Sequence, residues 1–191
     1  AKALEAQKPG MVGFCNYSWN SFLSYDFAER VKAKYPDTII LFGGPDYGLS
    51  VEEIDVFWRE HSLIDFYIVG EGEVSAGCLY TKLKERSFDV RALKSSGEVL
   101  GSCHYVHDGK VVCNDTTPRV KTLTELPSPY LLGLMDKFWE TSLAPLIATT
   151  RGWPFLCTMC AEGASYYNKE AHNDNFEREL DYIARHVKNT T

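Results

Sequence analysis

The sequence lacks a run of lysine or arginine, an apolar stretch long enough to cross a bilayer, and a signal-peptide pattern at its start. The formal net charge of −6 and the missing basic run argue against a nucleic-acid partner. Without a span or a leader pattern, we expect a cytoplasmic protein. Its six cysteines are too sparse and too irregularly spaced for a disulfide scaffold. At 191 residues, the chain fits one large domain, or one domain and part of another.

Short apolar runs, glycine turns and helical patterns alternate along the first half of the chain. We expect strands at 11–15, 38–42 and 65–69, and helices at 21–35, at 51–60 and from the turn at 70–73 to about residue 86. This alternation predicts an α/β fold of the flavodoxin-like or Rossmann-like type, a parallel sheet with helices on both faces. Residues 2–7 have the pattern of the end of a helix. We therefore expect that the chain is cut from something longer and that at least one strand precedes it.

The alternation stops after residue 87, and residues 101–114 have the pattern of a β-hairpin around an Asp-Gly dipeptide. With those two residues as the loop, His104 lies opposite Cys113. Cys103 and Cys113 then point to opposite faces, which argues against a disulfide between them. The same alternation separates His104 from His107, so we expect both histidines on the surface rather than on one metal ion.

The second half begins with a proline-rich connector and continues with a strand at 144–148, a cysteine-containing loop and a helix at 175–187 with Asp174 as its N-cap. A strand, a loop and a helix in this order have the form of the first βα unit of a TIM-type barrel. The predicted division is an α/β domain at 1–95, a hairpin and connector at 96–141, and the start of a barrel at 142–191.

The loop from Thr149 to Gly163 resembles the cluster-binding loop of the radical S-adenosylmethionine (SAM) enzymes, in which three cysteines are spaced C-x3-C-x2-C. Cys157 and Cys160 stand at the second and third positions, and Trp153 stands at the first. The Thr-Thr-Arg-Gly-x-Pro-Phe segment before them matches the family as well. The resemblance implies a [4Fe–4S] cluster that binds SAM, with one thiolate fewer than the cluster requires.

Four further motifs occur in the same order as in cobalamin-binding radical SAM proteins: residues 12–20, Phe-Gly-Gly-Pro at 42–45, Gly-Glu-Gly-Glu at 70–73, and Leu-Pro-Ser-Pro-Tyr at 126–130. Together with the cysteine loop, this resemblance covers nearly the whole chain. It implies that a cobalamin binds where the parallel strands end. Two features depart from the family. The Asp-x-His-x2-Gly motif that often supplies a histidine to cobalt is absent, and Asp46 stands where a histidine often follows Gly-Gly-Pro.

The resemblance assigns roles residue by residue. Cys157 and Cys160 would ligate the cluster, and the backbone of Met159 would contact the adenine of SAM. The other candidate cofactor-binding residues lie in the cluster loop or at the ends of the strands, namely Phe155, Cys15, Gly43, Gly44, Pro45, Gly70, Glu71 and Gly72. Considered without the family, the glycines can equally be ordinary turns between strands and helices. No catalytic residue can be named.

The remaining candidates have simpler explanations. We expect Trp19, Trp58 and Trp139 to be core or interface aromatics. Cys15 and Cys78 lie in apolar stretches and are expected to be buried thiols, although Cys15 closes a strand and could also face a corrin.

The resemblance implies a fragment of a cobalamin-dependent radical SAM enzyme, which would cleave SAM reductively and methylate or rearrange an unknown small-molecule or peptide substrate. It also implies an external electron donor. With one cluster ligand and most of the barrel missing, the chain itself is expected to be inactive. Two alternatives stay open. One is a non-catalytic module that binds cobalamin or another small ligand, and the other is a zinc or structural protein that uses Cys157 and Cys160.

Overall fold

The computed structural model describes residues 2–6, 8–48, 50–139, 144–152, 155, 157–159 and 170–187. The chain divides into two compact units, Ala1–Thr117 (unit 1) and Pro118–Thr191 (unit 2). Among the described residues, no helix is both long and apolar enough to cross a membrane.

Unit 1 is built on a five-stranded sheet with the strands in sequential order. The strands are β1 (Met11–Cys15), β2 (Ile39–Gly43), β3 (Phe66–Ile68), β4 (Cys103–His107) and β5 (Lys110–Cys113). The first three are parallel, as their apolar and β-branched composition predicts for strands that are covered on both faces. β4 runs antiparallel to β3 and extends the same sheet. The sheet is therefore mixed, and the α/β fold class predicted from the sequence is confirmed.

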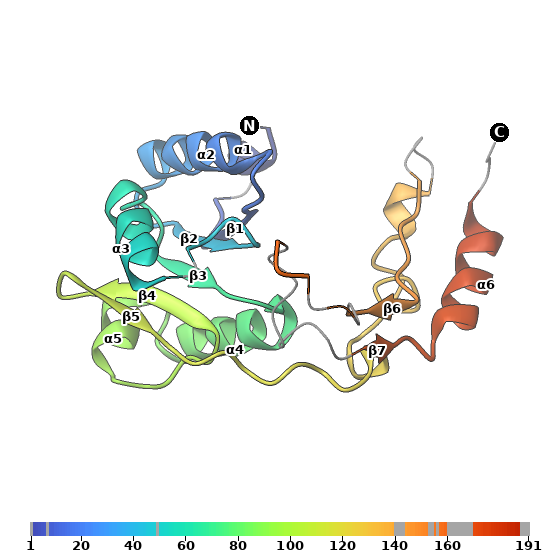
Figure 1. Ribbon diagram of the computed structural model, residues 1–191. Coiled ribbons are helices and arrows are strands. Elements are labelled where there is room, and N and C mark those ends of the chain that lie inside the picture. The colour runs from blue at the N-terminus through green and yellow to red at the C-terminus, as the bar shows by residue number, and fades with distance from the viewer. Residues whose placement is uncertain are drawn as a thin grey trace. The chain divides into compact units, whose positions relative to one another are not determined.

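Helices cover both faces of this sheet (Figure 1). The helices α2 (Ser21–Lys34) and α3 (Val51–Glu60) pack on one face, and α4 (Gly72–Glu85) and α5 (Val90–Ser95) pack on the other. A short α1 (Lys2–Ala6) precedes β1, and its Leu4 packs beside α2 and α3. Successive β1–β2 and β2–β3 connections thus place their helices on the same face, and the chain changes face after β3.

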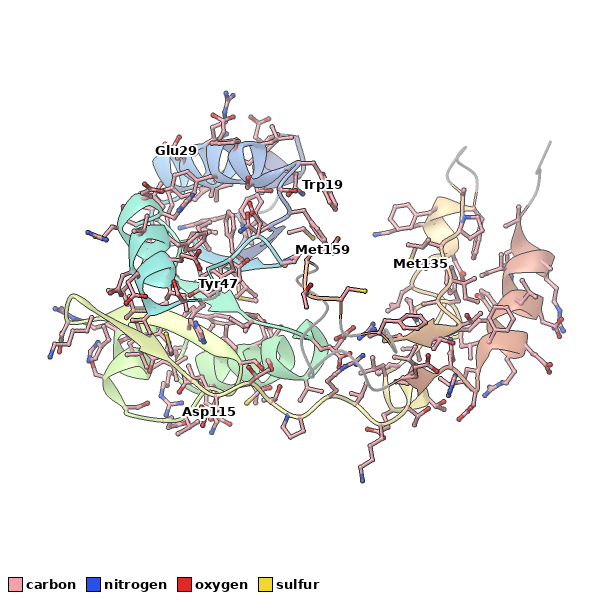
Figure 2. The ribbon with its side chains drawn as sticks, in the orientation of Figure 1. Trp19, Glu29, Tyr47, Asp115, Met135 and Met159 are labelled. Carbon is pink, nitrogen blue, oxygen red and sulfur yellow. The ribbon has the colours of Figure 1, made fainter. Side chains whose placement is uncertain are left out.

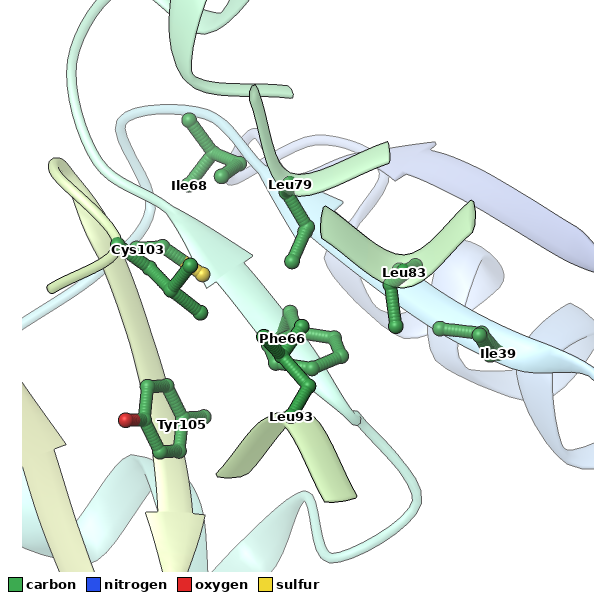
Figure 3. Close-up of a cluster of buried hydrophobic side chains, with 9 residues drawn as sticks. Ile39, Phe66, Ile68, Leu79, Leu83, Leu93, Cys103 and Tyr105 are labelled. Atoms are coloured by element: carbon green, nitrogen blue, oxygen red, sulfur yellow. The ribbon is translucent and has the colours of Figure 1, made fainter. Parts of the chain in front are cut away.

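The two faces bury separate hydrophobic clusters. Figure 3 shows the cluster under α4 and α5, in which Leu79, Leu83 and Leu93 meet side chains of the sheet such as Phe66 and Tyr105. The cluster under α2 and α3 contains Ala28, Val31, Ile40, Phe42, Trp58, Ile64 and Tyr67. Because side chains alternate along a strand, neighbouring residues such as Ile39 and Ile40 supply opposite clusters. The continuous apolar runs of the sequence are explained by this two-sided burial.

The hairpin has the register expected from its Asp-Gly loop, with His104 opposite Cys113 and His107 opposite Lys110. Cys103 is buried, Cys113 is exposed, and both are free thiols, as predicted. The hairpin does not stand apart in a connector, because β4 pairs with β3 inside the sheet of unit 1. Residue 95 is therefore not a break in this sheet, and the compact unit ends at Thr117.

The described residues of unit 2 form two 3₁₀ turns, η1 (Leu123–Glu125) and η2 (Asp136–Phe138), the antiparallel pair β6 (Thr150–Arg151) and β7 (Ala171–His172), and the helix α6 (Phe176–His186). The predicted strand at 144–148 is wrong, because these residues form no strand and pairing begins only at Thr150. The apolar run packs differently there, since Leu146 bonds through its backbone to the hydroxyl of Tyr130. The N-cap of α6 is Asn175 and not Asp174. The barrel itself stays a prediction.

Candidate functional site

The carboxyl ends of the parallel strands form one continuous row. Cys15 lies beside Gly43, Gly43 lies beside Ile68, and Ile68 lies beside Cys103 at the start of the antiparallel strand. The loops that leave this row begin at Asn16, Gly44 and Val69, so the predicted residues 15, 43–45 and 70–72 gather at one edge. Ligands of open α/β sheets bind at such edges. We refer to the row from Cys15 to Cys103 and its three loops as the sheet edge.

The thiol of Cys15 belongs to this edge, since Cys15 is exposed. The prediction that Cys15 and Cys78 are buried thiols is wrong. Cys15 is the last residue of β1, where helices no longer cover the strand, and Cys78 lies on the outer side of α4. An exposed thiol at the end of a strand is accessible to a ligand, whereas a thiol in the core is not.

The turn at 43–45 has its shape because of glycine. Gly44 has φ = +142°, and a Cβ at this position would lie 2.3 Å from the carbonyl oxygen of Asn16. A Cβ on Gly43 would lie 3.3 Å from the carbonyl oxygen of Ile68. Glycine is therefore required at position 44 by the neighbouring backbone, and at position 43 it avoids a tight contact, which is the ordinary explanation left open by the sequence. They allow the β1 and β2 loops to approach each other at the sheet edge.

A buried asparagine ties these two loops together. The side-chain amide of Asn16 donates to the carbonyl of Asp46 and, over 3.2 Å, to the hydroxyl of Tyr67. That hydroxyl in turn donates to the carbonyl of Gly44 over 2.8 Å. The backbone amides of Asn16 and Asp46 complete the connection, because they donate to the carbonyls of Gly43 and Asn16. The sheet edge is thus held in one conformation before any ligand arrives.

Tyr47 continues this network into the face covered by α3. Its ring stacks on Tyr67 with centroids 4.1 Å apart, and its hydroxyl accepts from Trp58 Nε1 over 2.8 Å. The same hydroxyl lies 3.0 Å from Nδ1 of His104, which leaves Nδ1 as the acceptor of the tyrosine proton. Burial raises the pKa of Tyr47 well above its usual range, so the hydroxyl keeps its proton.

His104 is buried, with 8% of its surface exposed, so the prediction of a surface histidine is wrong. Burial lowers its pKa, which favours the neutral ring that the bond from Tyr47 requires. The hairpin was predicted to belong to the segment 96–141, outside the α/β domain. Because β4 instead pairs with β3, His104 lies within the sheet and faces the side covered by α2 and α3, where it meets Tyr47. His107, nearer the hairpin tip, is half-buried.

The third loop of the edge reverses before α4. Gly70 has φ = +77°, a conformation that favours glycine, and Glu71 caps the helix in an extended conformation without a side-chain bond to it. Gly72 begins α4, and a Cβ there would make only ordinary contact with Ile68 at 4.0 Å. The first amides of α4 thus lie beside the sheet edge, where they favour an acceptor or an anion.

An aromatic pair stands in the loop after β1. Tyr17 and Trp19 stack with ring centroids 4.6 Å apart, and Trp19 is 78% exposed (Figure 2). Trp19 is therefore not a core residue, unlike Trp58, which is buried as expected. Trp139, in unit 2, is half-buried and stacks on Tyr130. A large exposed ring beside a preformed edge is suited to contact with a flat ligand.

Three candidate residues of the cysteine loop are described, and all of them are exposed. Cys157 is a free, exposed thiol, Phe155 is 62% exposed and Met159 is 94% exposed. Trp153 and Cys160 lie outside the described residues. Within the described part of the chain, no three His, Cys, Asp or Glu side chains come close enough to hold a metal ion. The exposure of Met159 means that it does not fill the core of the described structure.

Four residues important for this geometry were not assigned roles from the sequence, namely Asn16, Tyr47, Tyr67 and His104. Asn16 stood inside the first family motif, directly after the strand, which was the available signal. Tyr47 follows the Gly-Gly-Pro turn, but nothing in a single sequence indicates that its hydroxyl bridges Trp58 and His104. Such a network joins four elements and becomes visible only in three dimensions.

No protein-family model matches the chain. Curated proteins do match it along most of its length. It is 27% identical over 188 residues to the cobalamin-dependent radical SAM methyltransferase TokK of Streptomyces tokunonensis, covering 94% of this chain and 26% of that protein. It is 25% identical over 186 residues to the 2-(S-pantetheinyl)-carbapenam-3-carboxylate methyltransferase of Streptantibioticus cattleyicolor, covering 93% of this chain and 26% of that protein. An uncharacterized methyltransferase of Pyrococcus horikoshii is 26% identical over 186 residues, covering 96% of this chain and 38% of that protein.

Among solved structures, the cobalamin-dependent SAM radical enzyme OxsB matches with a TM-score of 0.65 at 22% identity, covering 98% of this chain and 25% of that one. At this identity the likeness concerns the fold. The resemblance to cobalamin-binding radical SAM proteins that the motifs indicate is confirmed by the names of these relatives. The chain spans about a quarter of the length of the first two of them.

Proposed function

We propose that this chain is part of a cobalamin-dependent radical SAM methyltransferase and that unit 1 is the part that binds cobalamin. The observation that carries this proposal is the coincidence of two results. The chain aligns over 94% of its length with a relative of that name, and its sheet edge gathers the residues that the motifs single out. An external electron donor and a small-molecule or peptide substrate belong to the same proposal.

The residues at the sheet edge fit a corrin. The edge combines an exposed thiol at Cys15, an exposed proline at Pro45, a large exposed ring at Trp19 and the first amides of α4 after Gly72. These groups provide an apolar surface and amide donors for a ring system that carries amide side chains and a phosphate. Cobalamin, when bound, supplies a transferable methyl group.

The protein's own contribution is orientation. Asn16, Gly44 and Tyr67 hold the β1 and β2 loops together through hydrogen bonds that exist without the ligand. A loop that is already ordered loses little conformational entropy when a ligand binds to it. The proposed role of this network is therefore to keep Cys15, Pro45 and Trp19 in place for the corrin.

The cysteine loop does not fit a [4Fe–4S] cluster of the radical SAM type. Such a cluster takes three cysteine thiolates, whereas Cys157 and Cys160 are two, and the indole of Trp153 supplies no thiolate. We propose that this chain does not cleave SAM. The missing thiolate supports a second candidate function, a module that binds cobalamin without catalysis. The third candidate is a protein that binds zinc through Cys157 and Cys160.

Cobalamin binding is tested by titrating the whole chain with hydroxocobalamin and following its visible spectrum or equilibrium dialysis. We expect one cobalamin per chain, and at least about fivefold weaker binding in Trp19→Ala, because a stacked ring contributes about 1 kcal/mol beyond its buried area. Trp139→Ala, which removes a tryptophan from unit 2, is the matched control and should bind normally. Absence of binding, or equal loss in both variants, would contradict the cobalamin role.

The cluster is tested separately by anaerobic reconstitution with iron and sulfide, read by iron content and visible absorbance. We expect the unchanged chain to gain little iron and Trp153→Cys to gain a cluster. Trp153→Cys combined with Cys157→Ala is the control, since it again offers two thiolates. Equal, stoichiometric iron in all three would disprove the proposed effect of Trp153, and stoichiometric zinc in the unchanged chain would favour the zinc alternative.

A further inference from the structure

A groove of about 560 Å³ lies between α2 and α3 in unit 1. It is lined by Asn16 after β1, by α2, by the loop that precedes α3, by α3 itself and by His61. Figure 2 labels two residues that line it, Glu29 on α2 and Tyr47 before α3. Asn16, Pro45, Asp46 and Tyr47 of the sheet-edge loops also line this groove, whereas Cys15 and Trp19 do not. A ligand held by the side chains of α2 and α3 therefore uses residues that the cobalamin proposal does not.

The lining of the groove is strongly acidic. None of its lining residues is a lysine or an arginine, and five carry carboxylates. These five are Asp26, Glu29, Asp46, Glu53 and Glu60. Two of the five are engaged elsewhere, because Asp26 pairs with Arg30 over 3.0 Å and Glu53 caps α3 through the amide of Ser50. In the part of the chain that the structure describes, Glu29 and Glu60 form no ion pair. The groove thus presents uncompensated negative charge.

Aromatic rings form the walls of the same groove. Phe22 is 90% exposed, the ring of Phe57 stacks on that of His61 with centroids 4.3 Å apart, and Tyr25 meets His61 edge-to-face with centroids 4.7 Å apart. The faces of such rings attract cations. His61 Nδ1 donates to the carbonyl of Phe57 over 2.8 Å, which leaves Nε2 of the neutral ring as an acceptor. Rings, carboxylates and this nitrogen all favour a ligand that is cationic and rich in N–H donors.

We infer that the groove between α2 and α3 binds a linear organic polyamine. A volume of this size holds a small organic molecule rather than a single ion. No three His, Cys, Asp or Glu side chains of the described residues are placed to hold a metal ion, so the separated carboxylates do not suit a bare divalent cation. A chain of ammonium groups spaced by methylenes matches separated carboxylates and places its methylenes against the rings. A quaternary ammonium ion would leave the acceptors without donors.

The test is calorimetric titration of the whole chain with spermidine at matched ionic strength, with tetramethylammonium and Mg²⁺ as comparison cations. We expect one spermidine per chain, with the two comparison cations at least about tenfold weaker. Glu29→Gln/Glu60→Gln should weaken spermidine binding at least about tenfold, because two ion pairs in a half-enclosed groove are lost. Phe22→Ala should weaken it about threefold through loss of a cation–π contact.

The matched control is Glu52→Gln/Glu125→Gln, which makes the same change of net charge at exposed residues that do not line the groove. It should alter the affinity less than about twofold, as expected of exposed charges that do not line the groove. The inference is overturned if spermidine does not bind, if Mg²⁺ displaces it as well at equal ionic strength, or if the control variant weakens binding as much as the groove variant.

Discussion

Unit 1 buries two hydrophobic clusters against a five-stranded sheet, whereas the described residues of unit 2 bury four hydrophobic side chains around a two-stranded pair and one helix. Those four are Leu123, Tyr130, Ala171 and Ile183. The family motifs, however, are distributed over both units. The sequence similarity to the relatives therefore extends over both units. Both proposed binding sites lie in unit 1.

The comparison also teaches how a polar site is supported. In unit 1 the cluster under α2 and α3 encloses the network of Asn16, Tyr67, Tyr47 and His104. The polar groups of this network therefore have few hydrogen-bond partners other than one another. In unit 2 the corresponding polar contacts are mostly exposed, as in the bonds that Tyr182 and Trp139 donate to Asp136. Water can replace exposed contacts at little cost, and buried contacts cannot be replaced in this way.

The largest expected effect tests whether the two units are stable independently. Phe66→Ala removes a fully buried ring from the cluster under α4 and α5, and should destabilise unit 1 by about 3–5 kcal/mol. Hydrogen exchange should then accelerate in β1, β2 and β3 and stay unchanged in α6. The reciprocal variant Ile183→Ala should cost unit 2 about 2 kcal/mol and leave the amides of β1–β3 protected. Loss of protection in both units from either variant would mean that they unfold as one.

The second prediction concerns the sheet edge. Gly44→Ala should destabilise unit 1 by about 2–3 kcal/mol, because the new Cβ meets the carbonyl of Asn16 in a backbone conformation that favours glycine. Gly13→Ala is the matched control in β1, since its Cβ would meet nothing within 4 Å. Urea unfolding monitored by far-UV circular dichroism measures both changes. Equal midpoints for the two variants would show that the close approach of the two loops carries no strain.

Most of unit 1 could be predicted from the sequence, because its signals are local. Glycine turns end the strands, β-branched runs fill them, and the Asp-Gly dipeptide sets the register of the hairpin. What could not be predicted was pairing between distant segments. The placement of β4 beside β3 decides that His104 is buried, and no spacing within 101–114 reveals that neighbour.

Helix faces were also only partly predictable. The helical spacing of α6 predicts one apolar stripe that contains Leu180 and Ile183. Ile183 is buried as this predicts, but Leu180 is exposed and Glu179 is buried. Glu179 accepts a bond from the side chain of Asn173 over 2.8 Å, which compensates its burial. The candidate site was predictable at the level of the strand ends. Its polar network was not, because a hydrogen bond between Tyr47 and His104 joins residues 57 positions apart.

The third prediction compares two tyrosine hydroxyls, one in each unit. Tyr47→Phe leaves Trp58 Nε1 and His104 Nδ1 without their buried partner and should cost unit 1 about 1–3 kcal/mol. Tyr130 is itself buried, and its hydroxyl also bonds twice, to the backbone of Leu146. Tyr130→Phe should cost unit 2 less than about 1 kcal/mol, because both groups that lose their partner belong to the exposed Leu146, which water can reach. Thermal unfolding of both variants, followed by hydrogen exchange in each unit, measures the difference. Equal costs would refute the contrast between enclosed and exposed polar contacts.

The smallest expected effect is a pH dependence that is confined to unit 1. Burial lowers the pKa of His104 from its ordinary value of 6.5, so below that value the unfolded chain takes up a proton that the folded chain does not. The contribution of His104 to stability is therefore complete above pH 6.5 and is lost as the pH falls toward the lowered pKa. Urea midpoints measured from about pH 8 to about pH 5 should decline, and the decline should be shallower in His104→Gln. His186→Gln, which changes a histidine of α6, should keep the slope of the unchanged chain, since that ring does not contribute to unit 1. If His104→Gln keeps the full slope, carboxylates and not the Tyr47–His104 bond account for the acid sensitivity of the sheet edge.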